Sequence, residues 1–187
     1  MRAEADSTRV TSFLEALGRA ARTSGRVYLT GGATAVLKGW RASTVDVDIE
    51  FDPEAAGVFE AIPELKQRLD LNVELASPAQ FIPVPLAWRA RSEWIGTFGK
   101  LDAFHFDYTA QALAKIERDH VRDRTDVNAM LARGHVTRDG LLDAFEEIRP
   151  SLIRFPAIDP SSFERRVRHL CATDEEGHRG GLDELLD

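Results

Sequence analysis

The sequence predicts an α+β fold, in which a mixed β-sheet is flanked by helices and followed by a helical C-terminal region. Residues 45–51 alternate without a fault between apolar and acidic side chains. The first helix candidate carries apolar residues at helical spacing, and the pattern from Thr109 onward is helical. Strands with interspersed helices, followed by a run of helices, are typical of this fold class. We expect an α/β core over 1–106, a helical C-terminal region over 107–172 that packs on this core, and an acidic tail over 173–187.

The first element is an amphipathic helix. Apolar residues between Val10 and Ala21 recur at intervals of three and four. Asp6 or Ser7 can cap its start. Gly25 falls just past its end, where a left-handed residue is favourable.

A short strand, a diglycine and a short helix come next. Residues 26–30 favour a strand, and Gly31 and Gly32 follow it directly. Residues 33–38 favour a short helix that ends at Gly39.

The strand at 45–51 has two different faces. A period of two separates its side chains. The apolar face carries Val45, Val47, Ile49 and Phe51, and the other face carries Asp46, Asp48 and Glu50. Pro53 ends the strand.

A helix and a third strand follow. Segment 54–69 has a helical pattern, which Pro63 is expected to break or restart. Residues 71–75 alternate again. Their period of two directs Leu71, Val73 and Leu75 to the core and places Asn72 and Glu74 together on the other face.

The remaining elements are a loop, a hairpin and four helices. Three prolines restrict residues 77–88 to a loop. Strands at 94–98 and 101–106 are joined by a turn at Gly99 and Lys100. The helices are expected at 109–118, 121–132, 137–148 and 162–171, the last with Ser161 or Ser162 as its cap.

Composition favours a cytoplasmic protein without a membrane segment. Cys171 is the single cysteine, which excludes an internal disulfide and a cysteine-based zinc site. No apolar run approaches the ~18 residues of a spanning helix. The net charge is −7, but residues 173–187 carry six acids against one arginine. The rest of the chain is therefore close to neutral and has no general electrostatic footprint for nucleic acid.

Asp46 and Asp48 are candidate ligands for a divalent cation. Side chains at i and i+2 of a strand point the same way, about 6–7 Å apart. Magnesium prefers one or two carboxylates together with water and substrate phosphates. Acidic alternation is also common on a half-exposed strand, so the pair alone does not identify a metal site.

The diglycine is a candidate phosphate-binding turn. Two glycines between a strand and a helix let backbone N–H groups approach a phosphate closely, and Thr30 and Thr34 add hydroxyls at either edge. The alternative is a tight turn that needs only a positive φ.

Together these features resemble the signature of the polymerase-β-like nucleotidyltransferase superfamily. The signature is a hydrophobic residue, Gly, then Gly or Ser, a spacer, and Asp-hydrophobic-Asp. Here it reads Leu29-Thr30-Gly31-Gly32-Ala33-Thr34 followed by Ser43-Thr44-Val45-Asp46-Val47-Asp48-Ile49. Lys115 resembles that family's helical lysine motif. Arg122-Asp123-Arg124-Thr125-Asp126 resembles the Arg-Asp-x-x-Asp motif of the abortive-infection, type IV toxin-like branch.

The resemblance implies a nucleotidyltransferase-like fold and a catalytic site with two Mg²⁺ ions. Asp46, Asp48 and a third carboxylate would bind the metals and be catalytic. Glu74 is our choice for the third carboxylate, although the family often has Asp there, and Glu50 is the alternative. The amides of Gly31 and Gly32 would bind the β- and γ-phosphates of a nucleoside triphosphate, with Thr34 beside them.

Two further residues are expected at the nucleotide. Lys115 would place a positive charge near the phosphates, or it is an exposed lysine paired with Asp119. Asp126 would contact Lys115 or the ribose, or it pairs with Arg122. Lys115 and Asp126 are about 16 Å apart along a straight helix, so we expect a break near residue 120.

The resemblance implies transfer of a nucleoside monophosphate from a nucleoside triphosphate to a hydroxyl of RNA, transfer RNA included, or of a protein. It further implies the toxin of a toxin–antitoxin pair, with a cognate antitoxin protein as partner. One alternative is a small-molecule nucleotidyltransferase of the antibiotic-modifying kind. Another is a catalytically decayed copy that acts as a binding or antitoxin-like module.

Overall fold

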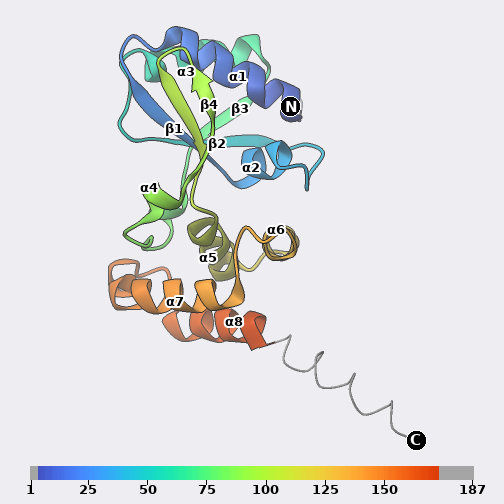
Figure 1. The fold of residues 1–187 in the computed structure, drawn as a ribbon, viewed down its shortest axis with the longest axis vertical. Helices are drawn as coiled ribbons and strands as arrows, with labels where there is room; N and C mark the ends of the chain where they lie inside the picture. Colours follow the sequence, from blue (N-terminus) through green and yellow to red (C-terminus); the bar gives the residue numbers. More distant parts are fainter. Residues whose placement is uncertain (1–3, 173–187) are drawn as a thin grey trace, which may run out of the picture.

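The computed structural model describes residues 4–172, which form an α+β fold around a five-stranded mixed sheet (Figure 1). The strands lie in the order β3-β2-β1-β5-β4. Their bounds are β1 Gly25–Thr30, β2 Asp46–Phe51, β3 Asn72–Leu75, β4 Glu93–Phe98 and β5 Leu101–His105. Strand β1 is antiparallel to β2 and parallel to β5, β2 is parallel to β3, and β4 and β5 form the expected antiparallel hairpin.

The described helices fall into two groups. Helices α1 Ser7–Ala20, α2 Gly31–Leu37, α3 Val58–Arg68 and α4 Trp88–Arg91 are interspersed with the strands, and a 3₁₀ turn, η1 Pro78–Gln80, follows β3. Helices α5 Tyr108–Arg118, α6 Val121–Ala132, α7 Arg138–Ile148 and α8 Pro160–Ala172 come last, with a second 3₁₀ segment, η2 Arg149–Arg154, between α7 and α8. The expected acidic tail lies outside the described residues.

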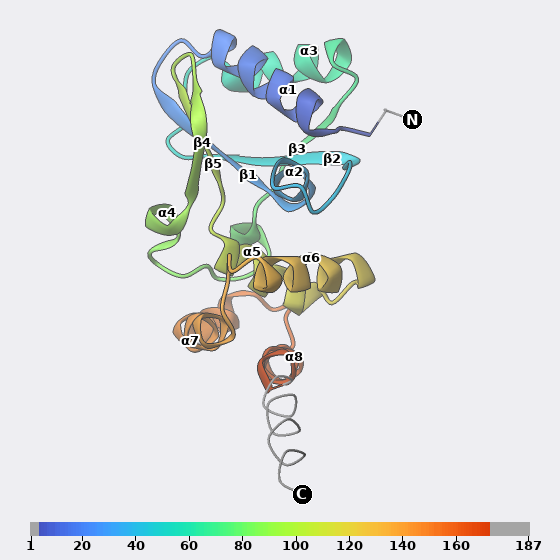
Figure 2. The same cartoon turned by 45° about the vertical axis from the view of Figure 1, so that its right-hand side comes forward.

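Helices α1 and α3 cover one face of the sheet (Figure 2). Asp6 caps α1, because its side chain accepts a hydrogen bond from the Arg9 N–H at 2.9 Å. The expectation that Gly25 ends this helix is wrong. Gly25 is the first residue of β1, and a Cβ atom there would lie 2.7 Å from the Ala55 nitrogen. Close backbone packing therefore explains this glycine.

The sequence misplaced two features around α3 and β3. Pro63 lies inside α3, which continues through it. A proline at this position removes one hydrogen bond, whereas Ile62 and Leu65 remain buried in the core and hold the helix in place. Leu75 was expected to face the core but is 47% exposed, because β3 is the edge strand and ends there.

Helices α5 to α8 form a second core on the other side of the sheet (Figures 1 and 2). A small aromatic cluster joins this helical lobe to the sheet lobe. Trp88 stacks on Phe106 with ring centroids 4.3 Å apart, and Tyr28 of β1 meets Trp88 edge-on at 4.9 Å. Ala110 of α5 belongs to the same buried cluster, which therefore connects the helical lobe to the sheet.

The expected break between α5 and α6 is confirmed. Helix α5 ends at Asp119, which has a left-handed φ of 57°, and α6 starts two residues later. In the last helix, Asp159 accepts hydrogen bonds from the Ser161 N–H and the Ser162 hydroxyl, so it takes the capping role expected of those serines. None of the helices within residues 4–172 has the length and apolar character needed to cross a membrane.

Candidate functional site

Strands β2 and β3 bring three carboxylates together. In their parallel register Asp48 lies opposite Glu74, and Asp46 lies opposite Asn72. The Asn72 side-chain amide donates hydrogen bonds to Asp46 at 2.6 Å and to Glu74 at 3.0 Å. The predicted acid cluster therefore spans two neighbouring strands, with one amide group between two of its members.

Asp48 is the member whose ionisation is most perturbed. Its pKa is raised from 3.8 to about 6, first by burial and then by the negative charges of Asp46 and Glu74. Lys115 and Arg118 act in the opposite direction but do not outweigh these effects. Burial and the two neighbouring carboxylates therefore disfavour a negative charge on Asp48, and a bound cation would offset both effects.

The donor chemistry fits a magnesium ion, although the carboxylates do not yet converge. Among residues 4–172, no group of three or more His, Cys, Asp or Glu side chains is arranged to hold a metal. Mg²⁺ needs only one or two carboxylates if water and phosphate oxygens complete its shell. Asp46 and Asp48 meet that requirement. The Asn72 amide holds one oxygen of Glu74, Oε1, and leaves Oε2 as the oxygen that could join them.

Glu50, the alternative third carboxylate, lies elsewhere. It lines a separate cavity of about 290 Å³ with Glu54 and Phe59, and its Oε2 atom is buried without a hydrogen-bond partner among the described residues. Glu74, in contrast, lines a cavity together with Asp46 and Asp48.

The diglycine is needed for close packing. Gly31 has a positive φ of 59°, and a Cβ atom there would lie 2.8 Å from the Asp48 Oδ2. A Cβ atom on Gly32 would overlap the Thr44 hydroxyl. The Gly31 N–H donates to the Gln111 side chain at 2.9 Å, so its predicted role as a phosphate donor is not available in this arrangement.

Thr34 does not reach the site. Its side chain is fully buried, its hydroxyl donates to the Leu29 carbonyl at 3.0 Å, and His105 lies 3.2 Å from the same oxygen. The prediction that Thr34 contacts the nucleotide is wrong, because the hydroxyl faces the interior between α2 and the sheet.

Lys115 is buried beside the acid cluster. It is 7% exposed, and its Nζ lies 2.6 Å from Asp126 and 3.4 Å from Asp123. The alternative pairing with Asp119 is wrong, because that aspartate pairs with Arg124 at 2.7 Å.

Asp126 is a structural anchor. Its side chain is 1% exposed and accepts hydrogen bonds from Arg41 at 2.8 and 2.6 Å and from the Trp40 indole at 3.2 Å, in addition to Lys115. The predicted contact with Lys115 is confirmed. The alternative pairing with Arg122 is not found among the described residues. The burial of Asp126 and its bonds to Arg41, Trp40 and Lys115 argue against the predicted contact with a ribose.

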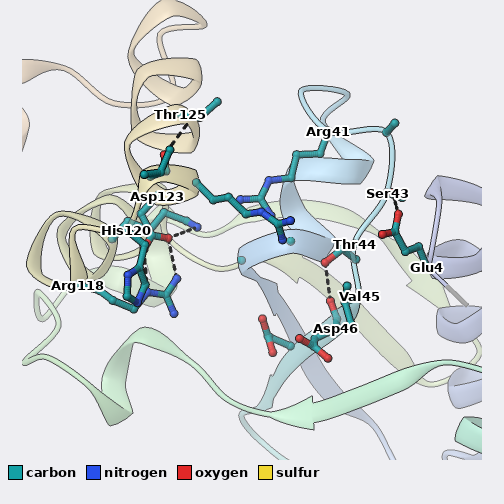
Figure 3. A pocket seen from close by; sticks show the side chains of 17 residues that line it. Glu4, Arg41, Ser43, Thr44, Val45, Asp46, Arg118, His120, Asp123 and Thr125 are labelled. Carbon is teal, nitrogen blue, oxygen red and sulfur yellow. Dashed lines mark hydrogen bonds and ion pairs between the residues drawn. The ribbon is translucent and has the colours of Figure 1, made fainter. Parts of the chain in front are cut away.

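Two cavities meet at the acid pair. One of about 740 Å³ extends from Gly32 and Arg41 to the start of α6, and one of about 450 Å³ extends from Glu74 to Phe81. Both are lined by Gly31, Asp46, Asp48, Lys115 and Arg118. Figure 3 shows the larger hollow, with Arg41 and Arg118 on different sides of it and Asp46 at its base.

Sequence reasoning missed four residues of this site. Arg118 acts on the charge of Asp48, Asn72 donates to Asp46, Gln111 accepts from the Gly31 N–H, and Arg41 pairs with Asp126. Arg118 pairs with Asp123 at 2.6 Å, and this contact raises the pKa of the guanidinium. Its place one turn after Lys115 on the same helix was the only signal in the sequence.

Comparisons with known proteins identify no relative. No family model matches the chain, and neither a curated protein nor a solved structure matches it.

Proposed function

We infer that the chain is a magnesium-dependent nucleotidyltransferase with a nucleotidyltransferase-like fold. It transfers a nucleoside monophosphate from a nucleoside triphosphate to a hydroxyl group. The observation that carries this proposal is the carboxylate cluster at Asp48, where burial first and then the negative charges of Asp46 and Glu74 raise its pKa to about 6. This cluster adjoins the diglycine turn and a cavity with several cationic side chains.

The metal would be held by Asp46 and Asp48, with Glu74 as a further ligand. When bound, Mg²⁺ neutralises phosphate charge and lowers the pKa of the acceptor hydroxyl. Asp46 and Asp48 line both cavities, so they would hold the positive charge of the metal ion where the two cavities adjoin.

The larger cavity suits the triphosphate. Arg41, Arg118 and Arg122 line it, together with Lys115 and His120. Arg41 and Lys115 are both held by Asp126, so they are already oriented before a substrate binds. Arginine side chains fit phosphate oxygens geometrically as well as electrostatically.

The reaction exchanges a phosphoanhydride bond for a phosphoester bond. The acceptor oxygen forms a bond to the α-phosphorus, and the bond from that phosphorus to the β-phosphate bridging oxygen breaks. Pyrophosphate leaves with that bonding pair. Glu74, which lines the second cavity and lies opposite Asp48, is the carboxylate that can take the hydroxyl proton.

The test is transfer of label from an α-³²P nucleoside triphosphate to an acceptor pool in the presence of Mg²⁺. The doubly substituted Asp46→Asn, Asp48→Asn protein should lose at least about 100-fold of the transfer rate. Glu50→Gln is the matched control, because it removes a carboxylate of the same strand outside the site. Equal labelling by the doubly substituted and unchanged proteins contradicts the proposal.

A second candidate is a nucleotide-binding protein without catalysis. The Gly31 amide is occupied by Gln111, and the carboxylates are not converged on one point, which are the observations that favour it. Magnesium-dependent nucleotide binding without any transfer would support this candidate over the enzyme.

A further inference from the structure

We propose that the side-chain amide of Asn72 takes the place of one of the two Mg²⁺ ions that the family resemblance implies, so that the acid cluster binds a single divalent cation. This inference rests on the proposed function for the identity of the site. It concerns the number of bound ions, which can be counted directly and without any transfer reaction.

The Asn72 amide lies between two carboxylates. Its Nδ2 atom donates one hydrogen bond to Asp46 Oδ1 at 2.6 Å and another to Glu74 Oε1 at 3.0 Å. An amide nitrogen carries two N–H groups, so these two bonds use its whole donor capacity. The opposite orientation of the amide would turn its oxygen toward two negative charges, which is unfavourable. The amide therefore brings partial positive charge to both acids, as a cation between them would.

The register of the sheet fixes this position. Asn72 is directly opposite Asp46 in the parallel pairing of β2 and β3, and Glu74 is opposite Asp48. Neighbouring strands lie about 4.8 Å apart, and side chains two residues apart on one strand share a face. A short side chain at position 72 thus reaches both of its partners, one across the strands and one along its own strand.

The amide holds the oxygen atoms that a second ion would need. In two-metal sites the ions lie about 3.5–4 Å apart, so each ion requires carboxylate oxygens of its own. An ion shared by Asp46 and Glu74 would compete with Asn72 for Asp46 Oδ1 and Glu74 Oε1. In agreement with this, no three His, Cys, Asp or Glu side chains within residues 4–172 are arranged to hold a metal.

One ion can still bind. Asp46 and Asp48 line both cavities, and the amide holds Asp46 through Oδ1 alone. Mg²⁺ needs only one or two carboxylates when water and phosphate oxygens complete its shell. The second oxygen of Glu74, Oε2, is not held by the amide and is left for the role of base proposed above.

The test counts bound Mn²⁺, which substitutes for Mg²⁺ and is detected by electron paramagnetic resonance. The full chain is mixed with one equivalent of the α,β-methylene analogue of ATP, which cannot transfer its nucleotide, and is titrated with Mn²⁺. The unchanged protein should bind one ion, with the spectrum of an isolated Mn²⁺. Asn72→Ala frees both acid oxygens, so it should bind two ions and give the spectrum of a spin-coupled Mn²⁺ pair.

A second variant and a control accompany this measurement. Asn72→Ser should also give the coupled pair, because a hydroxyl has a single O–H and cannot donate to both acids. It serves in place of Asn72→Ala if the alanine variant does not fold. Asn128→Ala is the matched control, since Asn128 is exposed on α6 and lines a cavity of about 430 Å³ that none of the three acids lines. It should keep one isolated ion.

Two results would overturn the inference: a spin-coupled pair in the unchanged protein, or one isolated ion in both Asn72→Ala and Asn72→Ser. The proposed function fails separately. If the unchanged protein binds one ion but transfers no label, only the reaction is contradicted. If label transfer requires Asp46 and Asp48 in a protein that binds two coupled ions, only the single-ion inference is contradicted. If the unchanged protein binds no more Mn²⁺ than the doubly substituted Asp46→Asn, Asp48→Asn protein, both are contradicted.

Discussion

The surroundings of the Asp48 carboxylate are formed by residues that lie far from it in the chain. Gly31 approaches its carboxylate because it has no side chain, and the register of β2 and β3 sets Glu74 opposite it. Lys115 and Arg118 reach the same place from α5. A carboxylate that is buried among other carboxylates is destabilised when ionised, so its charge opposes folding at neutral pH.

Because the charge of Asp48 opposes folding, we predict that Asp48→Asn stabilises the protein at pH 8. The folded-state pKa of about 6 lies above the usual 3.8, so between these values the unfolded state loses its proton first and stability falls as pH rises. Asp48→Asn has no carboxyl to ionise, so it avoids this loss of stability. We expect its free energy of unfolding to exceed that of the unchanged protein by about 2 kcal/mol at pH 8, and the two to be equal near pH 4. Urea denaturation at both pH values measures it. Glu15→Gln, at an exposed position, should show neither effect. A destabilised Asp48→Asn at pH 8 would contradict the account.

The corner between α5 and α6 is the element that assembles the cationic side of the site. The left-handed Asp119 redirects the chain, so that Lys115 and Asp126 meet although eleven residues separate them. The loop after α2 joins the same carboxylate through Trp40 and Arg41. One buried aspartate therefore ties the sheet lobe to the helical lobe.

Removing the negative charge of Asp126 should lower the free energy of unfolding. Asp126→Asn leaves the buried Lys115 and the partly buried Arg41 without their shared counter-charge, and we expect a loss of about 3–5 kcal/mol in the free energy of unfolding. Arg41→Met should lower the free energy of unfolding by less, because Asp126 keeps its ion pair with Lys115. Equilibrium unfolding in urea compares the two. Asp119→Asn is the control, since its partners are mostly exposed. A loss of less than about 1 kcal/mol for Asp126→Asn would show that the cluster is not an anchor.

Across the whole molecule, local patterns predicted the elements well. The alternation at 45–51 and 71–75 identified β2 and β3, and the distance between Lys115 and Asp126 required the break that is found near residue 120. These features depend on neighbours in the sequence. The period of two grouped Asp46 with Asp48 and Asn72 with Glu74. That the two strands are neighbours, as they are here, was expected only from the family resemblance.

The sequence did not reveal contacts between distant segments. Arg41 reaches Asp126 across 85 residues, and Gln111 reaches the Gly31 amide across 80 residues. No periodicity encodes either contact. Thr34 was misassigned for a related reason: its neighbours in sequence suggested a phosphate turn, but the packing of α2 on the sheet directs its hydroxyl to Leu29.

Because both cavities lie between the two lobes, ligand binding should stabilise the whole molecule. At a concentration about 100 times its Kd, a ligand that binds only the folded state adds about 2.7 kcal/mol. For a chain of this size that raises Tm by roughly 5–10 °C. We expect this shift with ATP and Mg²⁺ together at pH 8, measured by scanning fluorimetry, and a much smaller shift at pH 5, where Asp48 holds its proton and competes with the metal. Glu50→Gln should retain the shift and Asp46→Asn with Asp48→Asn should lose it. A shift of the same size at both pH values would place the ligand away from Asp48.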